Sequence, residues 1–217
     1  MRFLLLLALA AAPALAHAQI GIRAGLNVAD LVGDDADNDF EGAGIDEQPR
    51  LGLAAGVSYD LAFTPTLGAR VEAIYSQKGA KATVDAIEID GEEITAGGSI
   101  TTRLDYVEVP ILLTAGTTTA SGLEIRGFAG PALGFEINTG VSCSGDIEDG
   151  CDFEGEDGTR ALDLGAAVGA SVGAGPFAVD LRFTRSLRSV AKELEGPGTP
   201  EIFNSVFTVS GVYRIGR

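Results

Sequence analysis

The chain has 217 residues, with 15 Lys or Arg against 31 Asp or Glu, so its formal net charge is −16. Such an acidic chain repels nucleic acid and anionic lipid surfaces, and we expect no nucleic-acid partner. Its single histidine, His17, lies in a segment that we expect to be removed, which excludes Ser-His-Asp and His-ligated zinc chemistry from the mature protein.

Residues 1–18 have the features of a secretory signal peptide. Met1-Arg2 gives a short positive start, residues 3–15 form an apolar run, and Ala16-His17-Ala18 is a small-x-small cleavage site. The run is too short and too rich in alanine to favour a retained spanning helix. We therefore expect an exported mature domain at residues 19–217.

Residues 51–76 show the pattern on which the fold prediction depends. They predict two strands around Thr64-Pro65-Thr66, with period-two alternation on both sides of the turn. The larger apolar residues fall on one face, and small residues and charges fall on the other. A soluble barrel would place the bulk inside, so this inversion indicates a barrel whose outer face contacts lipid.

The same alternation recurs along the whole mature chain. Four long polar stretches and three short turns separate the predicted strands, and we expect long surface loops at 30–49, 77–101, 138–158 and 186–201. Within 77–101, residues 83–89 alternate, which indicates that strands extend beyond the bilayer there. Pro110 and Pro131 predict local irregularities because proline cannot donate a ladder hydrogen bond. The predicted strands are 19–28, 51–61, 67–76, 102–114, 123–137, 160–172, 177–184 and 203–215.

These elements predict an all-β fold: an eight-stranded antiparallel up-and-down transmembrane β-barrel of OmpA or OmpX size. Short periplasmic turns, long acidic extracellular loops and an even strand count are typical of outer-membrane barrels. Both ends of the domain then lie on the periplasmic side.

Charged residues with inward parity form the main candidate site. An eight-stranded barrel is just wide enough for side chains to fill it, and buried charges must be paired, so we expect a salt-bridge network in the lumen. An ion path through the lumen is the alternative. The expected members are Arg23, Asp60, Arg70, Glu72, Glu108, Glu124, Arg126, Asp163, Asp180, Arg182 and Arg214.

The polar stretches hold 23 of the 31 carboxylates and both cysteines. We expect a disulfide between Cys143 and Cys151 because the chain is exported. No metal site or other cofactor is expected, except that Asp35, Asp37, Asp39 and Asp46 have the spacing of a calcium loop without its glycine or flanking helices. A solvated acidic surface and recognition of a basic partner are the other interpretations of this charge.

Five segments resemble a known family. GIRAGLNVADL, LGLAAGVSYDLAFTPTLGARVEAIYSQKGAK, LDYVEVPILL, GFAGPALGFEI and VFTVSGVYRIG are similar to the outer-membrane β-barrel domain of PorT-like "porin family" proteins of Bacteroidetes-type bacteria. The resemblance covers nearly the whole mature chain. It implies the barrel fold and names no activity, since its motifs are strand patterns.

The sequence thus predicts a non-enzymatic protein of the outer membrane of a Gram-negative-type bacterium. We expect a filled, charged lumen and a structural or surface-interaction role, with outer-membrane lipid and the barrel-assembly machinery as partners and the surface partner unknown. The alternatives are a narrow solute or ion channel, and a soluble periplasmic lipocalin-like barrel that binds an apolar ligand in its lumen.

Overall fold

The computed structural model describes residues 18–33, 45–84, 87–89, 92–95, 97–145, 153–154, 159–192 and 201–215, and these ranges contain strands and no helix. Among them, no helix is long and apolar enough to cross a membrane. The strands are β1 (Ala18–Val32), β2 (Ile45–Ala62), β3 (Leu67–Val84), β4 (Ile87–Ile89), β5 (Glu92–Thr95), β6 (Gly98–Thr118), β7 (Leu123–Gly145), β8 (Phe153–Glu154), β9 (Leu162–Ala174), β10 (Phe177–Ser186) and β11 (Phe203–Ile215).

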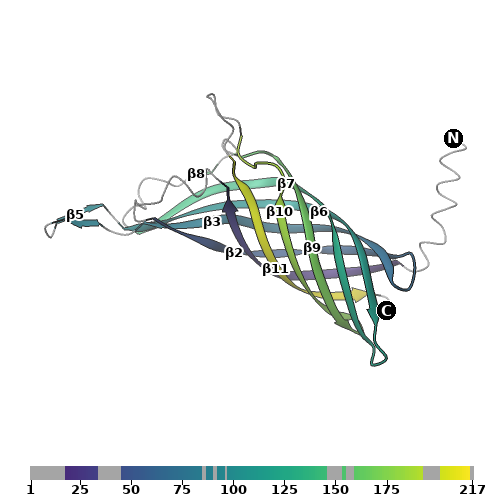
Figure 1. Ribbon diagram of the computed structural model, residues 1–217. Helices are drawn as coiled ribbons and strands as arrows, with labels where there is room; N and C mark the ends of the chain where they lie inside the picture. The colour runs from purple at the N-terminus through teal and green to yellow at the C-terminus, as the bar shows by residue number, and fades with distance from the viewer. Residues whose placement is uncertain are drawn as a thin grey trace, which may run out of the picture.

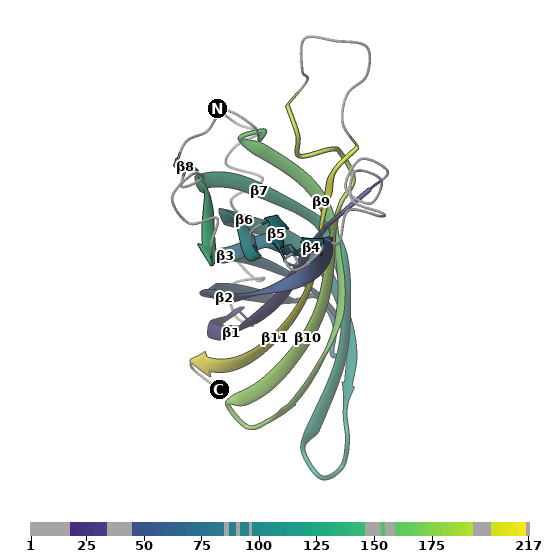
Figure 2. The same cartoon turned by 90° about the vertical axis from the view of Figure 1, so that its left-hand side faces the viewer.

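Eight of these strands close into an antiparallel ring. The order β6-β3-β2-β1-β11-β10-β9-β7 is closed by pairing of β6 with β7, while β8 adds to the edge of β7 and β4 pairs only with β5. The hairpin of β4 and β5 lies at one end of the ring (Figure 1), and Figure 2 shows the ring from that end. The predicted eight-stranded barrel is therefore confirmed.

Three short turns lie at one end of the barrel, together with the end of β11 (Figure 1). At residues 63–66 the hydroxyl of Thr64 accepts hydrogen bonds from the amides of Thr66 and Leu67 at 3.2 and 2.9 Å. Gly122 and Gly175 have φ of 82° and 56° in the other two turns, a region that glycine enters without a steric penalty. By the rule that periplasmic turns are short, we assign this end to the periplasm.

The predicted loop boundaries were partly wrong. β2 begins at Ile45, β3 runs to Val84, β6 begins at Gly98 and β7 runs to Gly145, so parts of the stretches 30–49, 77–101 and 138–158 are strands. Pairing continues through these extensions, to Val84 opposite Gly98 and Gly98 opposite Gly145, although the register of β2 with β3 shifts between Pro49 and Ala54. Polarity in the sequence marks the edge of the apolar band, whereas backbone hydrogen bonding continues beyond it.

The two faces of the wall have the predicted inverted polarity. Large apolar side chains point outward, and Leu51, Leu113 and Phe177 are 73%, 71% and 64% exposed. Charged and small residues alternate with them on the inner face, as in β10, where Asp180 and Arg182 are buried. Because the outer face of the ring carries an apolar band, that band suits a lipid environment and not water.

Both prolines interrupt a ladder, as predicted. Beside Pro110 the pairing of β3 with β6 passes from Val71–Ile111 to Ile74–Glu108 without the residues between. Beside Pro131 the pairing of β6 with β7 is interrupted while its register is kept. The register itself shifts elsewhere, between Asp105 and Tyr106.

We predict that Leu113→Arg lowers the free energy of unfolding in bilayers by about 2 kcal/mol, because it places a charge on the lipid-facing wall. Leu187→Arg is the matched control: Leu187 is also 71% exposed but follows the end of β10, beyond the short-turn half of the barrel. Urea titration in vesicles, followed by heat-modifiable gel migration, measures both. Equal stabilities for the two variants would contradict a lipid-facing Leu113.

A candidate ion-pair network in the barrel lumen

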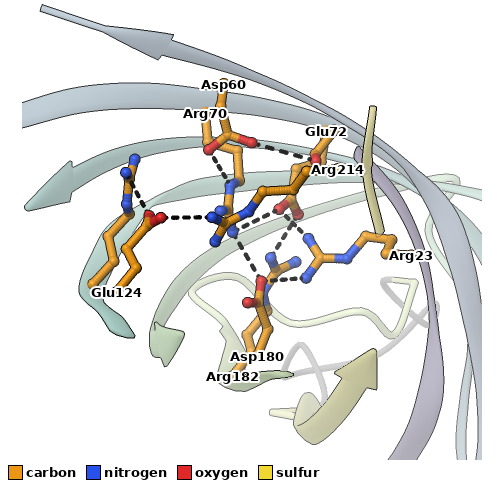
Figure 3. Close-up of polar contacts among 10 residues, drawn as sticks. Arg23, Asp60, Arg70, Glu72, Glu124, Asp180, Arg182 and Arg214 are labelled. Atoms are coloured by element: carbon orange, nitrogen blue, oxygen red, sulfur yellow. Dashed lines mark hydrogen bonds and ion pairs between the residues drawn. The ribbon is translucent and has the colours of Figure 1, made fainter. Parts of the chain in front are cut away.

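The centre of the lumen holds three arginines and three carboxylates. They come from four strands that meet in the ring, β1, β2, β3 and β10, and inward parity directs every one of them into the lumen. All are buried, with exposed fractions of 8% or less. The members of this central group are Arg23, Asp60, Arg70, Glu72, Asp180 and Arg182 (Figure 3).

Arg70 links two sides of the central group. Its Nε donates to Oδ1 of Asp60 at 2.8 Å on the neighbouring strand β2. Its Nη1 lies 2.8 Å from Oδ2 of Asp180 on β10 and 3.7 Å from Oε1 of Glu72. One guanidinium therefore holds carboxylates from three strands, which its fork of donors makes possible.

Two of these carboxylates also bind further arginines, one in the case of Asp180 and two in the case of Glu72. Asp180 Oδ2 also accepts from Nη2 of Arg23 at 2.7 Å. Glu72 accepts from Nη1 of Arg23 through Oε1, and from Nη2 of Arg182 through Oε2 at 2.6 Å. The central group is thus a closed set of three positive and three negative charges, and its formal charge is zero.

A second group lies nearer the short turns. Glu124, the second residue of β7, contacts Arg126 Nη2 at 2.6 Å and Arg214 Nη1 at 2.7 Å (Figure 3). The side chain of Arg126 is 26% exposed, so it is the least buried of the predicted lumen residues. Two arginines against one carboxylate give this group a formal charge of +1.

A third group lies toward the opposite end. Lys78 on β3 places its Nζ 2.7 Å from Oε1 of Glu108 and 3.1 Å from Oδ2 of Asp163. The amide of Asn204 also donates to Asp163 at 3.0 Å, and the Lys78 ammonium lies 4.6 Å from the centre of the Tyr106 ring. One lysine against two carboxylates gives a formal charge of −1.

All eleven predicted lumen residues therefore lie in ion pairs, and the structure adds Lys78. Six cations now face six carboxylates, and the +1, 0 and −1 groups sum to zero. Lys78 was missed because the sequence places it in a predicted loop. Its parity was the available signal, since Glu72, Ile74, Ser76 and Lys78 are all buried at alternate positions of β3.

Phe128 is a second residue that the sequence analysis missed. Its ring is buried on β7, and the guanidinium carbons of Arg70 and Arg182 lie 5.5 and 5.3 Å from its centre. A cation over an aromatic face is attracted by the ring quadrupole. Gly169 makes room for this ring, because a Cβ there would lie 2.5 Å from Phe128.

The remaining predicted sites lie at the edge of what the structure describes. Cys143 is buried and disulfide-bonded, and the sequence's other cysteine, Cys151, lies outside the described residues, so their pairing stays a prediction. Asp35, Asp37, Asp39 and the side chain of Asp46 also lie outside them. Within the described ranges, no group of three or more His, Cys, Asp or Glu residues could hold a metal ion.

Residues 12–192 match the family model described as the outer membrane protein beta-barrel domain. Solved structures similar to the chain include Ail, the attachment invasion locus protein of Yersinia pestis, crystallised with the heparin analogue sucrose octasulfate; the identity is 12%, the match covers 91% of this chain and 99% of Ail, and the TM-score is 0.42.

Neisserial surface protein A is similar at 10% identity, over 89% of this chain and 96% of that one, with a TM-score of 0.44. OprG from Pseudomonas aeruginosa is similar at 12% identity, over 92% and 96%, with a TM-score of 0.38. A comparison with curated proteins gave no match.

We predict that Lys78→Met lowers the free energy of unfolding by about 3–5 kcal/mol, because it leaves two buried carboxylates without their shared cation. Lys81→Met, on the same strand and at a half-buried position, is the control and should change stability little. Adding Glu108→Gln to Lys78→Met should recover part of the loss. Urea midpoints of the three variants measure the effect, and a fully stable Lys78→Met would contradict the pairing.

Proposed function

Because the chain belongs to the outer membrane protein β-barrel domain family, and so lies in the outer membrane of a Gram-negative bacterium, we propose that it is a plugged barrel with a structural or partner-binding role at the cell surface. It acts neither as a channel nor as an enzyme. The observation that carries this proposal is the neutral ion-pair network across the lumen.

The network supports a closed lumen on grounds of size and charge. Eight strands enclose only enough space for side chains, and here arginines from β1, β3 and β10 meet carboxylates from β2, β3 and β10 in that space. Each central carboxylate is held at hydrogen-bonding distance by at least one guanidinium. A solute would have to separate these pairs in order to pass, at a cost of several kcal/mol.

The charged groups of the lumen are also paired with one another, and this pairing disfavours catalysis. Lys78 lies between two carboxylates, and Tyr106 donates its hydroxyl hydrogen to Glu136 at 3.2 Å. A nucleophile or general base needs a free reactive group within reach of a substrate. The lumen offers paired charges instead.

The strand extensions support a role outside the membrane. β2, β3, β6 and β7 continue as a four-stranded sheet past the last pair of β1 with β2, Ala29 with Arg50 (Figure 1). Beyond it the β4–β5 hairpin sets Glu88 directly opposite Glu93. In the sequence, residues 87–95 hold three glutamates, one aspartate and no basic residue, a composition that favours a cationic partner.

We predict that the purified protein gives no stable conductance in planar bilayers. The double variant Glu72→Ala/Arg182→Ala, which removes a central pair and keeps the lumen neutral, should produce measurable single-channel current. Arg126→Ala is the control, because Arg126 is the most exposed member and should leave the lumen closed. Stable conductance of the unmodified protein would favour the channel alternative.

A second prediction concerns the β4–β5 hairpin. Cells that display the protein should bind a polylysine probe, and Glu88→Gln/Glu93→Gln should weaken this binding several-fold with an unchanged barrel. Raising the salt concentration should reduce the difference, because exposed charges are screened within about 10 Å at 0.1 M salt. Binding that is equal for both proteins at low salt would argue against a cationic partner at this hairpin.

A further inference from the structure

The outer wall of the barrel has an apolar hollow near the short turns. Its volume is about 470 Å³, and it crosses β3, β6, β7 and β9. Thr114 is the one polar side chain among its lining residues. The residues that shape it are Phe63, Leu67, Leu113, Ala115, Gly127 and Val168.

The strand registers explain why the wall is hollow here. Leu67 pairs with Ala115, Ala115 with Gly127, and Gly127 with Ala170, so three small residues lie side by side across three strands. The next outward row contains Leu113, Ala129 and Val168. The small residues Ala115 and Gly127 therefore form the floor of the hollow. The larger side chains of Leu67, Leu113 and Val168 form its sides.

Gly127 leaves space at the bottom of the hollow, although its backbone conformation does not require a glycine. It has no positive φ, and the nearest atoms to a Cβ added there would be 3.9 and 4.0 Å away. Glycine in a strand interior weakens the strand and often marks a close approach by another group. Gly169, beside it in the hollow, is different, because the Phe128 ring requires it.

A smaller hollow of about 260 Å³ adjoins the first at the turn after β2. Ala62, Phe63, Thr64 and Pro65 line it, and Phe63 is shared by both. None of the described residues that line the two hollows is charged. A larger apolar hollow and a smaller, partly polar one thus share Phe63 at the periplasmic end of the wall.

We propose that this pair of hollows is a binding site for one phospholipid of the periplasmic leaflet. An acyl chain lies over Ala115 and Gly127, and the glycerol and headgroup lie at the Thr64-Pro65 turn. The volume falls within the range of about 300–1,000 Å³ that is usual for small-molecule sites. The described lining residues are uncharged and the chain has a net charge of −16, so a zwitterionic headgroup such as phosphatidylethanolamine fits better than an anionic one.

A second copy of the barrel fits the hollow less well than a lipid tail. The floor is flanked by Leu67, Leu113 and Val168, so the convex wall of another barrel meets these side chains before it reaches Gly127. A flexible acyl chain can pass between them. Each methylene removed from water or from loose packing adds to its retention.

The test uses two outward glycines in matched surroundings. Gly127→Leu fills the floor, and Gly211→Leu is the control, because a Cβ at Gly211 also has its nearest neighbour at 3.9 Å and Gly211 lines neither hollow. The proteins are reconstituted with equal amounts of phosphatidylethanolamine and phosphatidylglycerol, extracted in mild detergent, and examined by native mass spectrometry. Retained phosphatidylethanolamine should fall several-fold in Gly127→Leu and stay unchanged in Gly211→Leu.

A fluorescence measurement provides an independent readout, because the chain contains no tryptophan. Phe63 and Phe177 are 61% and 64% exposed, and both lie at the periplasmic end of the wall. Phospholipid with brominated acyl chains should quench Phe63→Trp at a lower mole fraction than Phe177→Trp. Heat-modifiable migration verifies folding, and Ala115→Leu replaces Gly127→Leu if that variant does not fold.

Three results would overturn the proposal. They are equal lipid retention by Gly127→Leu and Gly211→Leu, retention of phosphatidylglycerol in place of phosphatidylethanolamine, and a dimer of the unmodified protein that Gly127→Leu dissociates. The last result would assign the hollow to a second copy.

Discussion

The interior of this barrel is governed by the need to pair every buried charge. A carboxylate or guanidinium taken out of water without a partner costs several kcal/mol, and a ring of eight strands has little space for water to take the partner's place. The chain meets this requirement by letting one charged group pair with two or more groups of opposite charge. Glu72, Asp180 and Glu124 each contact at least two cations, and Lys78 contacts two carboxylates. The six ion-paired cations and six ion-paired carboxylates have a formal charge of zero in sum, and the further carboxylate Glu136 accepts hydrogen bonds from Tyr106 and Thr159.

The convergence of these charged side chains also explains why many residues of the inner face are small. Long side chains from β1, β3, β7 and β10 meet in one narrow space, so neighbouring positions must be small. Gly169 is the clearest case, since a methyl group there would overlap the Phe128 ring that lies against Arg70 and Arg182. Because the paired charges fill much of the inside, most large apolar side chains lie on the outer face. Lipid there takes the place of the usual hydrophobic core.

The sequence predicted the ring and the side of the wall on which each charge lies, because strand alternation is local. Residues 51–76 alone carry that signal in both strands of the hairpin. It did not predict the partners. Arg23 meets Glu72 and Asp180, which are 49 and 157 residues away, through strand tilt and closure that no local pattern encodes. Lys78 was missed for another reason, since hydropathy marks the edge of the lipid and hydrogen bonding carries β3 past it.

The network also limits where function can reside. Glu72 joins β3 to arginines on β1 and β10, and Arg70 joins β3 to β2 and β10, so a movement of one of these strands breaks contacts on several others. The spanning wall is therefore held as a unit. Lys78 on β3 pairs with Glu108 on β6 and Asp163 on β9 where the extended sheet of β2, β3, β6 and β7 leaves the spanning wall. The binding roles proposed above are therefore assigned to segments outside the spanning wall and to its lipid-facing surface.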